Sequence, residues 1–102
     1  MPVTCTLEER QLTACIEGEL DHPGAKKIME ELGRQIDVLL PRELILDLEK
    51  VTFSDSSAIA VVLRSWKRMV QLGGGMQVIH TPEQTAKVFR AAGLDRMIQF
   101  KE

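Results

Sequence analysis

The chain has 102 residues and a net charge of -2, which comes from 13 basic and 15 acidic residues spread without long runs. This length fits a single domain over residues 1–102 with one ordinary core, and the scattered charges exclude a basic stripe for nucleic acid. The first residues lack the pattern of a secretory leader, and no apolar run approaches the roughly 20 residues that cross a bilayer, so we expect a cytoplasmic protein.

Two short alternating patterns come first in the chain. They flank the polar turn at residues 8–10, and period-two alternation on both sides of a turn predicts an antiparallel hairpin. Cys5 and Cys15 lie in these neighbouring strands and could be opposed, but in a cytosolic chain we expect free thiols. The apolar positions of the two predicted strands are Val3, Cys5, Leu7, Leu12, Ala14 and Ile16.

A helix is predicted from Pro23 to Leu39. Pro23 suits the first helical position because the amide hydrogen that proline lacks would have no partner there. Pro41 stops the helix, and the apolar run from Leu44 to Leu48 predicts a short strand in the interior of a sheet. The side of the helix that has the spacing of a buried stripe consists of Ala25, Ile28, Met29, Leu32 and Ile36.

The polar stretch from Val51 to Ala58 predicts a turn between that strand and a second helix. Ser54 or Asp55 suits the N-cap, because a side-chain oxygen there can accept a bond from an unpaired amide of the first helical turn. Ser56 then falls at the first or second helical position. Helical spacing assigns Ile59, Val62, Leu63, Trp66, Met69 and Val70 to the core, and Arg64, Ser65, Lys67, Arg68 and Gln71 to the solvent.

The last third of the chain predicts two more strands and one more helix. Residues 73–75 are glycines that suit a left-handed helix end, and residues 76–79 return as a strand. Thr81, Pro82 and Gln84 then fit the cap, first and third positions of a helix that starts with a capping box. The apolar side of this helix is Ala86, Val88, Phe89 and Ala92, Gly93 ends it, and Met97, Ile98 and Phe100 predict a short final strand.

The resulting order is β-β-α-β-α-β-α-β, which predicts an α/β sandwich. Crossovers between parallel strands are right-handed in nearly all proteins, so we expect a mixed sheet with its helices mainly on one face. Sites in such folds gather at the carboxyl ends of strands, which favours the turn at residues 51–58. Taken alone, the composition of this turn indicates no more than the capped start of a helix.

Several short motifs extend this interpretation over essentially the whole chain. In order they are Gly18-Glu19-Leu20-Asp21, Leu46-Asp47-Leu48, Phe53-x-Asp55-Ser56-Ser57, Gly73-Gly74-Gly75 and Gly93-Leu94-x-x-x-Ile98-x-Phe100. Each motif is weak alone, but their order and spacing are specific. Together they resemble the STAS domains of bacterial anti-sigma factor antagonists, including those that act in sporulation.

The resemblance implies a switch that works through protein partners. An antagonist of this family binds an anti-sigma factor that is also a serine kinase, which releases the sigma factor. The kinase phosphorylates a serine at the start of the central helix, and a protein phosphatase removes the phosphate. The resemblance assigns the phosphorylated residue to Ser56, with Ser57 as the alternative, and the partner-binding surface to Asp21, Asp55, Ser57 and Ala58. The family often has glycine where this chain has Ala58.

Other interpretations of the same residues stay open. The serines could form only an N-cap cluster, or the domain could be a non-switching STAS subunit of a transporter or signalling scaffold. An enzyme with a nucleophilic serine would need a positioned histidine, for which only His80 is a candidate. We expect no enzyme activity, no cofactor, and no nucleic acid or membrane as partner. His22 and His80 are far apart in the sequence, so we also expect no metal site.

Overall fold

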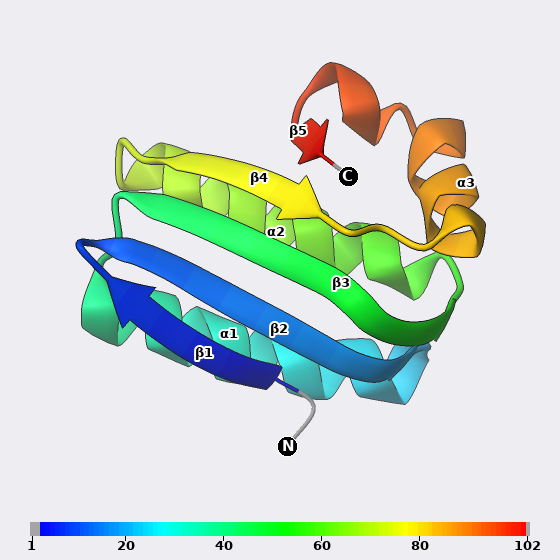
Figure 1. The fold of residues 1–102 in the computed structure, drawn as a ribbon, viewed down its shortest axis with the longest axis horizontal. Coiled ribbons are helices and arrows are strands. Elements are labelled where there is room, and N and C mark those ends of the chain that lie inside the picture. Colours follow the sequence, from blue (N-terminus) through cyan, green and yellow to red (C-terminus); the bar gives the residue numbers. More distant parts are fainter. Residues whose placement is uncertain (1–2, 102) are drawn as a thin grey trace.

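The computed structural model describes residues 3–101, which form a five-stranded sheet with helices packed against it (Figure 1). β1 pairs antiparallel with β2, the other neighbouring strands are parallel, and the strand order in the sheet follows the chain. The predicted α/β fold and element order are confirmed. The elements are β1 (Val3–Glu8), β2 (Gln11–Leu20), α1 (His22–Leu39), β3 (Glu43–Ser54), α2 (Ser57–Gln71), β4 (Gly75–Ile79), α3 (Glu83–Ala91), a 3-10 turn (Leu94–Arg96) and β5 (Gln99–Lys101).

The hairpin turns at Glu9 and Arg10, which both have positive φ angles of 50° and 66°. Two central residues with positive φ form the tight turn that matches the twist of antiparallel strands. Cys5 lies opposite Ala14, whereas Cys15 lies opposite Thr4, so the two thiols are on opposite faces of the sheet and both are free. The expectation of free thiols is confirmed, and alternation of side chains along a strand is the physical reason.

Helices α1 and α2 lie side by side against one face of the sheet (Figure 1). The opposite face of β2, β3 and β4 is turned toward the viewer in Figure 1 and is covered by neither of these helices. Within the described chain, no helix is both long enough and apolar enough to cross a membrane. The core between the helices and the sheet includes Leu12, Ala14, Ile16, Leu44, Leu46, Leu48 and Val78 from strands, and Ala25, Ile28, Leu32, Ile36, Val61, Val62 and Met69 from helices.

The predicted buried side of α2 is partly wrong. Helical spacing assigns Ser65 to solvent, but it is 6% exposed and its hydroxyl donates to the backbone oxygen of Val61 at 2.8 Å. This bond inside the helix satisfies the hydroxyl, so a serine can face the core without an unpaired polar group. The same spacing assigns Val70 to the core, but Val70 is 53% exposed. The helix is therefore rotated slightly from the orientation that its apolar residues predict.

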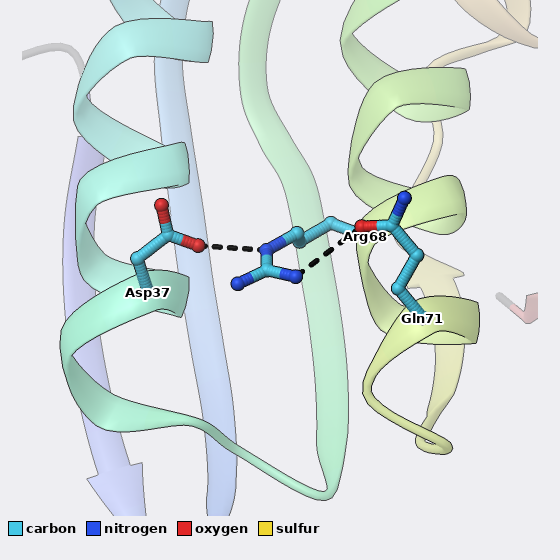
Figure 2. Close-up of polar contacts among 3 residues, drawn as sticks. All are labelled: Asp37, Arg68 and Gln71. Atoms are coloured by element: carbon cyan, nitrogen blue, oxygen red, sulfur yellow. Dashed lines mark hydrogen bonds and ion pairs between the residues drawn. The ribbon is translucent and has the colours of Figure 1, made fainter.

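A polar contact joins α1 and α2 at their solvent side. Arg68 donates through Nε to Asp37 Oδ1 at 2.7 Å and through a terminal nitrogen to Gln71 Oε1 at 3.2 Å (Figure 2). Both partners in the ion pair are substantially exposed, so it contributes at most about 1 kcal/mol to stability. The basic residues Arg64, Lys67 and Arg68 lie on the solvent side of α2, as predicted.

The start of α3 does not form the predicted capping box. The helix begins at Glu83, Pro82 occupies the cap position, and no side chain provides a capping bond there. The side chain of Gln84 instead bonds to the backbone of Ser54 at the end of β3. Ala92, which helical spacing assigns to the apolar side, is exposed, and Thr85 is buried. Gly93, with a φ of 74°, follows the helix as predicted.

Two glycines of α1 have opposite surroundings. A methyl group on Gly24 would collide with the backbone oxygen of Glu19 and would lie 3.0 Å from a carboxylate oxygen of Asp21, whereas one on Gly33 would meet no atom within 4 Å. The backbone of Glu19 cannot move away without disturbing β2. Glycine is therefore required at position 24 by close packing and is not required at position 33.

We predict opposite stability changes for two alanine substitutions in this helix. Gly24→Ala should lower the free energy of unfolding by about 1–3 kcal/mol through overpacking. Gly33→Ala should raise it by up to about 1 kcal/mol, because alanine favours a helix over glycine. Urea unfolding followed by circular dichroism measures both. Equal changes in the two variants would contradict the packing assigned to Gly24.

Candidate functional site

The candidate site lies where β2 and β3 end. The register of this parallel pair places Leu20 beside Ser54, so Asp21 and Asp55 each follow the end of neighbouring strands. The amide of Asp55 donates to the backbone oxygen of Leu20 at 3.2 Å, which joins the two chain segments directly. The Gly-Glu-Leu-Asp and Asp-Ser-Ser motifs, more than thirty residues apart in sequence, therefore meet at one edge of the sheet.

β3 continues farther than its apolar run predicts. The strand reaches Ser54, so residues 51–54 belong to a strand and the prediction of a turn from Val51 is wrong. These residues pair with β2 from Gly18 to Leu20, with register irregularities before and after Gly18. A neighbouring strand supplies their backbone partners, so polar side chains do not prevent strand formation. The turn that precedes α2 is reduced to Asp55 and Ser56.

The cap position of α2 is Ser56, directly after the two predicted candidates Ser54 and Asp55, but Asp55 supplies the side-chain bond at the start of the helix. Its carboxylate oxygen Oδ1 accepts from the amide of Ser57 at 2.7 Å, and its backbone oxygen accepts from the amide of Ala58 at 3.1 Å. A side-chain oxygen that bonds to the amide two residues ahead stabilises a helix start. Asp55 is thus held by Leu20 on one side and holds the first turn of α2 on the other.

Ser56 lies between Asp55 and the first residue of α2. The helix begins at Ser57, so the prediction that Ser56 occupies its first or second position is wrong by one residue. In the described structure Ser56 is exposed and its side chain makes no capping bond. The structure thus presents the Ser56 hydroxyl to solvent on a short turn whose neighbours are held in place.

The other two predicted residues of the turn differ in exposure. Ser57 is half-buried, and Ala58 is completely buried in the core. The expectation that Ala58 belongs to a partner-binding surface is therefore wrong for its side chain. The sequence resemblance compared position 58 with a family glycine, but exposure depends on the direction in which α2 leaves the turn.

The start of α3 holds the end of β3, a contact that the sequence did not predict. The side chain of Gln84 accepts from the amide of Ser54 at 2.9 Å and donates to the backbone oxygen of the same residue at 2.7 Å. The hydroxyl of Ser54 also lies 2.7 Å from that of Thr85, and both residues are buried. Ser54, the residue before Asp55, is therefore fixed by α3, a helix that lies far from it in the sequence.

Asp21 has a structural role at this edge. It caps α1, with its side chain accepting from the amide of Gly24 at 2.9 Å and its backbone oxygen accepting from Ala25 at 2.8 Å. It is half-buried, so part of the residue remains accessible. Asp21 therefore stabilises the start of α1, and a role in partner binding stays a prediction.

His80, the histidine considered as a catalytic base, contacts Asp47 and not a serine. Nδ1 of His80 is 3.0 Å from Oδ1 of Asp47. In the part of the chain that the structure describes, no hydrogen bond joins the side chain of Ser56 or Ser57 to a histidine. The geometry therefore does not assemble a serine and histidine pair of the kind that activates a nucleophile.

Comparison with protein families identifies the domain. The STAS domain family matches residues 8–102. The chain belongs to the STAS domain family. The match covers both motifs that meet at the candidate site, together with all three helices.

Individual relatives agree with this assignment at low sequence identity. A Bordetella bronchiseptica protein named as an anti-sigma factor antagonist is 27% identical over 93 residues, covering 91% of this chain and 79% of the relative. The structure of the anti-sigma factor antagonist SpoIIAA in its unphosphorylated form has a TM-score of 0.82 at 22% identity, with coverage of 96% and 86%. The Bacillus cell fate determinant SpoIIAA in its phosphorylated form has a TM-score of 0.74 at 21% identity, with coverage of 96% and 89%. This STAS domain thus shares the fold of both SpoIIAA forms.

We predict that Gln84 stabilises the STAS domain through Ser54. Gln84→Ala should lower the free energy of unfolding by about 1–2 kcal/mol, because it leaves a backbone amide and carbonyl of a buried residue without their partner. Urea unfolding measures the change. Glu83→Ala is the matched control, because Glu83 has only an exposed pair with Arg90, and its effect should stay within about 0.5 kcal/mol. Similar losses in both variants would contradict this assignment.

Proposed function

We propose that this STAS domain is an anti-sigma factor antagonist controlled by phosphorylation of Ser56. It binds an anti-sigma factor that is also a serine kinase, which releases a sigma factor in the cytoplasm. Phosphorylation ends the complex, and a protein phosphatase restores binding. The observation that carries the proposal is the exposed Ser56 hydroxyl in a STAS domain. Ser56 lies between the joined ends of β2 and β3 and the first turn of α2, to which Asp55 bonds.

The surroundings of Ser56 allow phosphorylation without a change of fold. A phosphate adds about 1.5 to 2 negative charges at neutral pH. Unpaired amides at a helix start attract an anion, but Asp55 already accepts from the amide of Ser57. The carboxylate of Asp55 repels a second anion, so the phosphate remains at the surface in contact with water. The core contacts of α2 need not change.

The same charge acts differently when a partner covers the turn. Binding removes water from the phosphate and places it against a surface that fitted a neutral hydroxyl. Like charges brought together at an interface cost several kcal/mol, and each 1.4 kcal/mol changes affinity tenfold. Asp21, Asp55 and Ser57 are accessible around Ser56 and form the proposed contact surface with it. Phe53, 47% exposed in the same strand end, adds an aromatic side chain of the type that often contributes to binding.

We predict that the cognate kinase and ATP phosphorylate Ser56. Mass spectrometry of the treated protein should locate one phosphate there, because the hydroxyl is exposed and has no capping role. Ser57→Ala should keep the modification, and Ser56→Ala should lose it. A phosphate found only on Ser57, or on neither residue, would contradict the proposal.

We also predict that charge at position 56 decides binding. Ser56→Asp should weaken kinase binding by at least about tenfold, and Ser56→Ala should bind within a few-fold of the unmodified protein. Titration calorimetry measures the dissociation constants. Val38→Asp is the control for added charge, because Val38 is 73% exposed near the opposite end of α1. Equal affinity of the two Ser56 variants would oppose the charge mechanism while leaving a partner complex intact.

A further inference from the structure

Three potential metal ligands meet on the sheet face that α1 and α2 leave uncovered. They are Asp47 and Glu49 of β3 and His80, which directly follows β4. One ligand atom from each lies within 4.8 Å of the other two, and His80 Nδ1 is already 3.0 Å from Asp47 Oδ1. The cluster combines an imidazole with two carboxylates and is separate from the turn at Ser56.

The fold itself brings these residues together. Leu46 and Leu48 face the helices and are fully buried, so Asp47 between them points to the opposite side of the sheet. Asp47 pairs with Ile79 in the parallel register, which places His80 beside it. The amide of Glu49 also donates to Asp47 Oδ1 at 3.0 Å.

The backbone around His80 adds to this arrangement. His80 has a φ of 54°, in the left-handed region that residues other than glycine seldom adopt, and its amide donates to the backbone oxygen of Lys101 at 3.2 Å. The bond to β5 holds the histidine where it approaches Asp47. Asp47 and His80 are thus positioned by three strands before any ion binds.

We propose that Asp47, Glu49 and His80 bind one divalent transition-metal ion of the Zn²⁺ type, with water completing the coordination. Tetrahedral zinc with bonds of about 2.1 Å to nitrogen and oxygen places its ligands roughly 3.4 Å apart. The Asp47–His80 pair is near that spacing, and Glu49 is exposed and can turn toward it. Imidazole favours Zn²⁺ over Mg²⁺ and Ca²⁺, which prefer oxygen ligands.

The charge around the cluster favours a cation. Cys15 lies beside Asp47 in the β2–β3 pairing, on the same face. Burial, followed by the charges of Asp47, Glu17 and Glu49, raises the pKa of this thiol, and the charge of Lys50 opposes them. Besides the two ligand carboxylates, the charges near this thiol are those of Glu17 and Lys50, which are opposite in sign. A bound Zn²⁺ would offset the negative charge of Asp47 and Glu49.

Calorimetric titration of the whole protein with ZnCl₂ tests the proposal. We expect one saturable site per chain, weakened at least about tenfold in His80→Asn and in Asp47→Asn. Asparagine tolerates the left-handed backbone better than most residues, so His80→Asn removes the ligand while preserving the local conformation. His22→Asn is the matched control, because it removes the other histidine, which is exposed at the start of α1, and should bind as the unmodified protein does.

Further variants separate this site from other zinc ligands. Zn²⁺ binding that persists in His80→Asn but is lost in Cys15→Ser would overturn the three-ligand site in favour of a thiol. Absence of saturable binding in the unmodified protein, or displacement of Zn²⁺ by a modest excess of Mg²⁺, would also overturn it. Unfolding measured without metal shows whether each variant remains folded.

Discussion

The candidate site depends on the pairing of β2 with β3 beyond the apolar part of β3. The register that places Leu20 beside Ser54 brings the two motif turns to one edge of the sheet, and the bond from the Asp55 amide to Leu20 joins them. The start of α2 then follows from the carboxylate of Asp55, and α3 holds Ser54 through Gln84. Loss of this pairing would separate the residues that surround Ser56.

This arrangement is compatible with the proposed switch at Ser56, which requires no change of fold. The residues on both sides of Ser56 make the hydrogen bonds that the local backbone requires, and Ser56 does not contribute a capping bond. A modification at that hydroxyl therefore need not break an interaction of the folded state. In the proposed function, its effect appears mainly in a complex, where the added charge loses water and meets a partner surface.

β3 contributes to both the proposed switch and the proposed metal site, but at different positions. Its carboxyl end leads into the turn at Ser56, and its middle presents Asp47 on the open face beside His80. The alternation of side chains along the strand allows this division, because one face packs on the helices and the other remains free for polar residues. The two proposals can therefore be tested by variants that do not share a residue.

The sequence by itself determined the order of the elements, the hairpin, the buried side of α1 and the family motifs, because each depends on residues close together in the chain. Tertiary structure alone decided that Gln84 bonds to Ser54, that Ala58 is buried, that Ser65 faces the core, and that Asp47 meets His80. Local spacing predicts which face of an element is apolar. It does not reveal strand register or the rotation of a helix, because both are set by packing between residues that are distant in sequence.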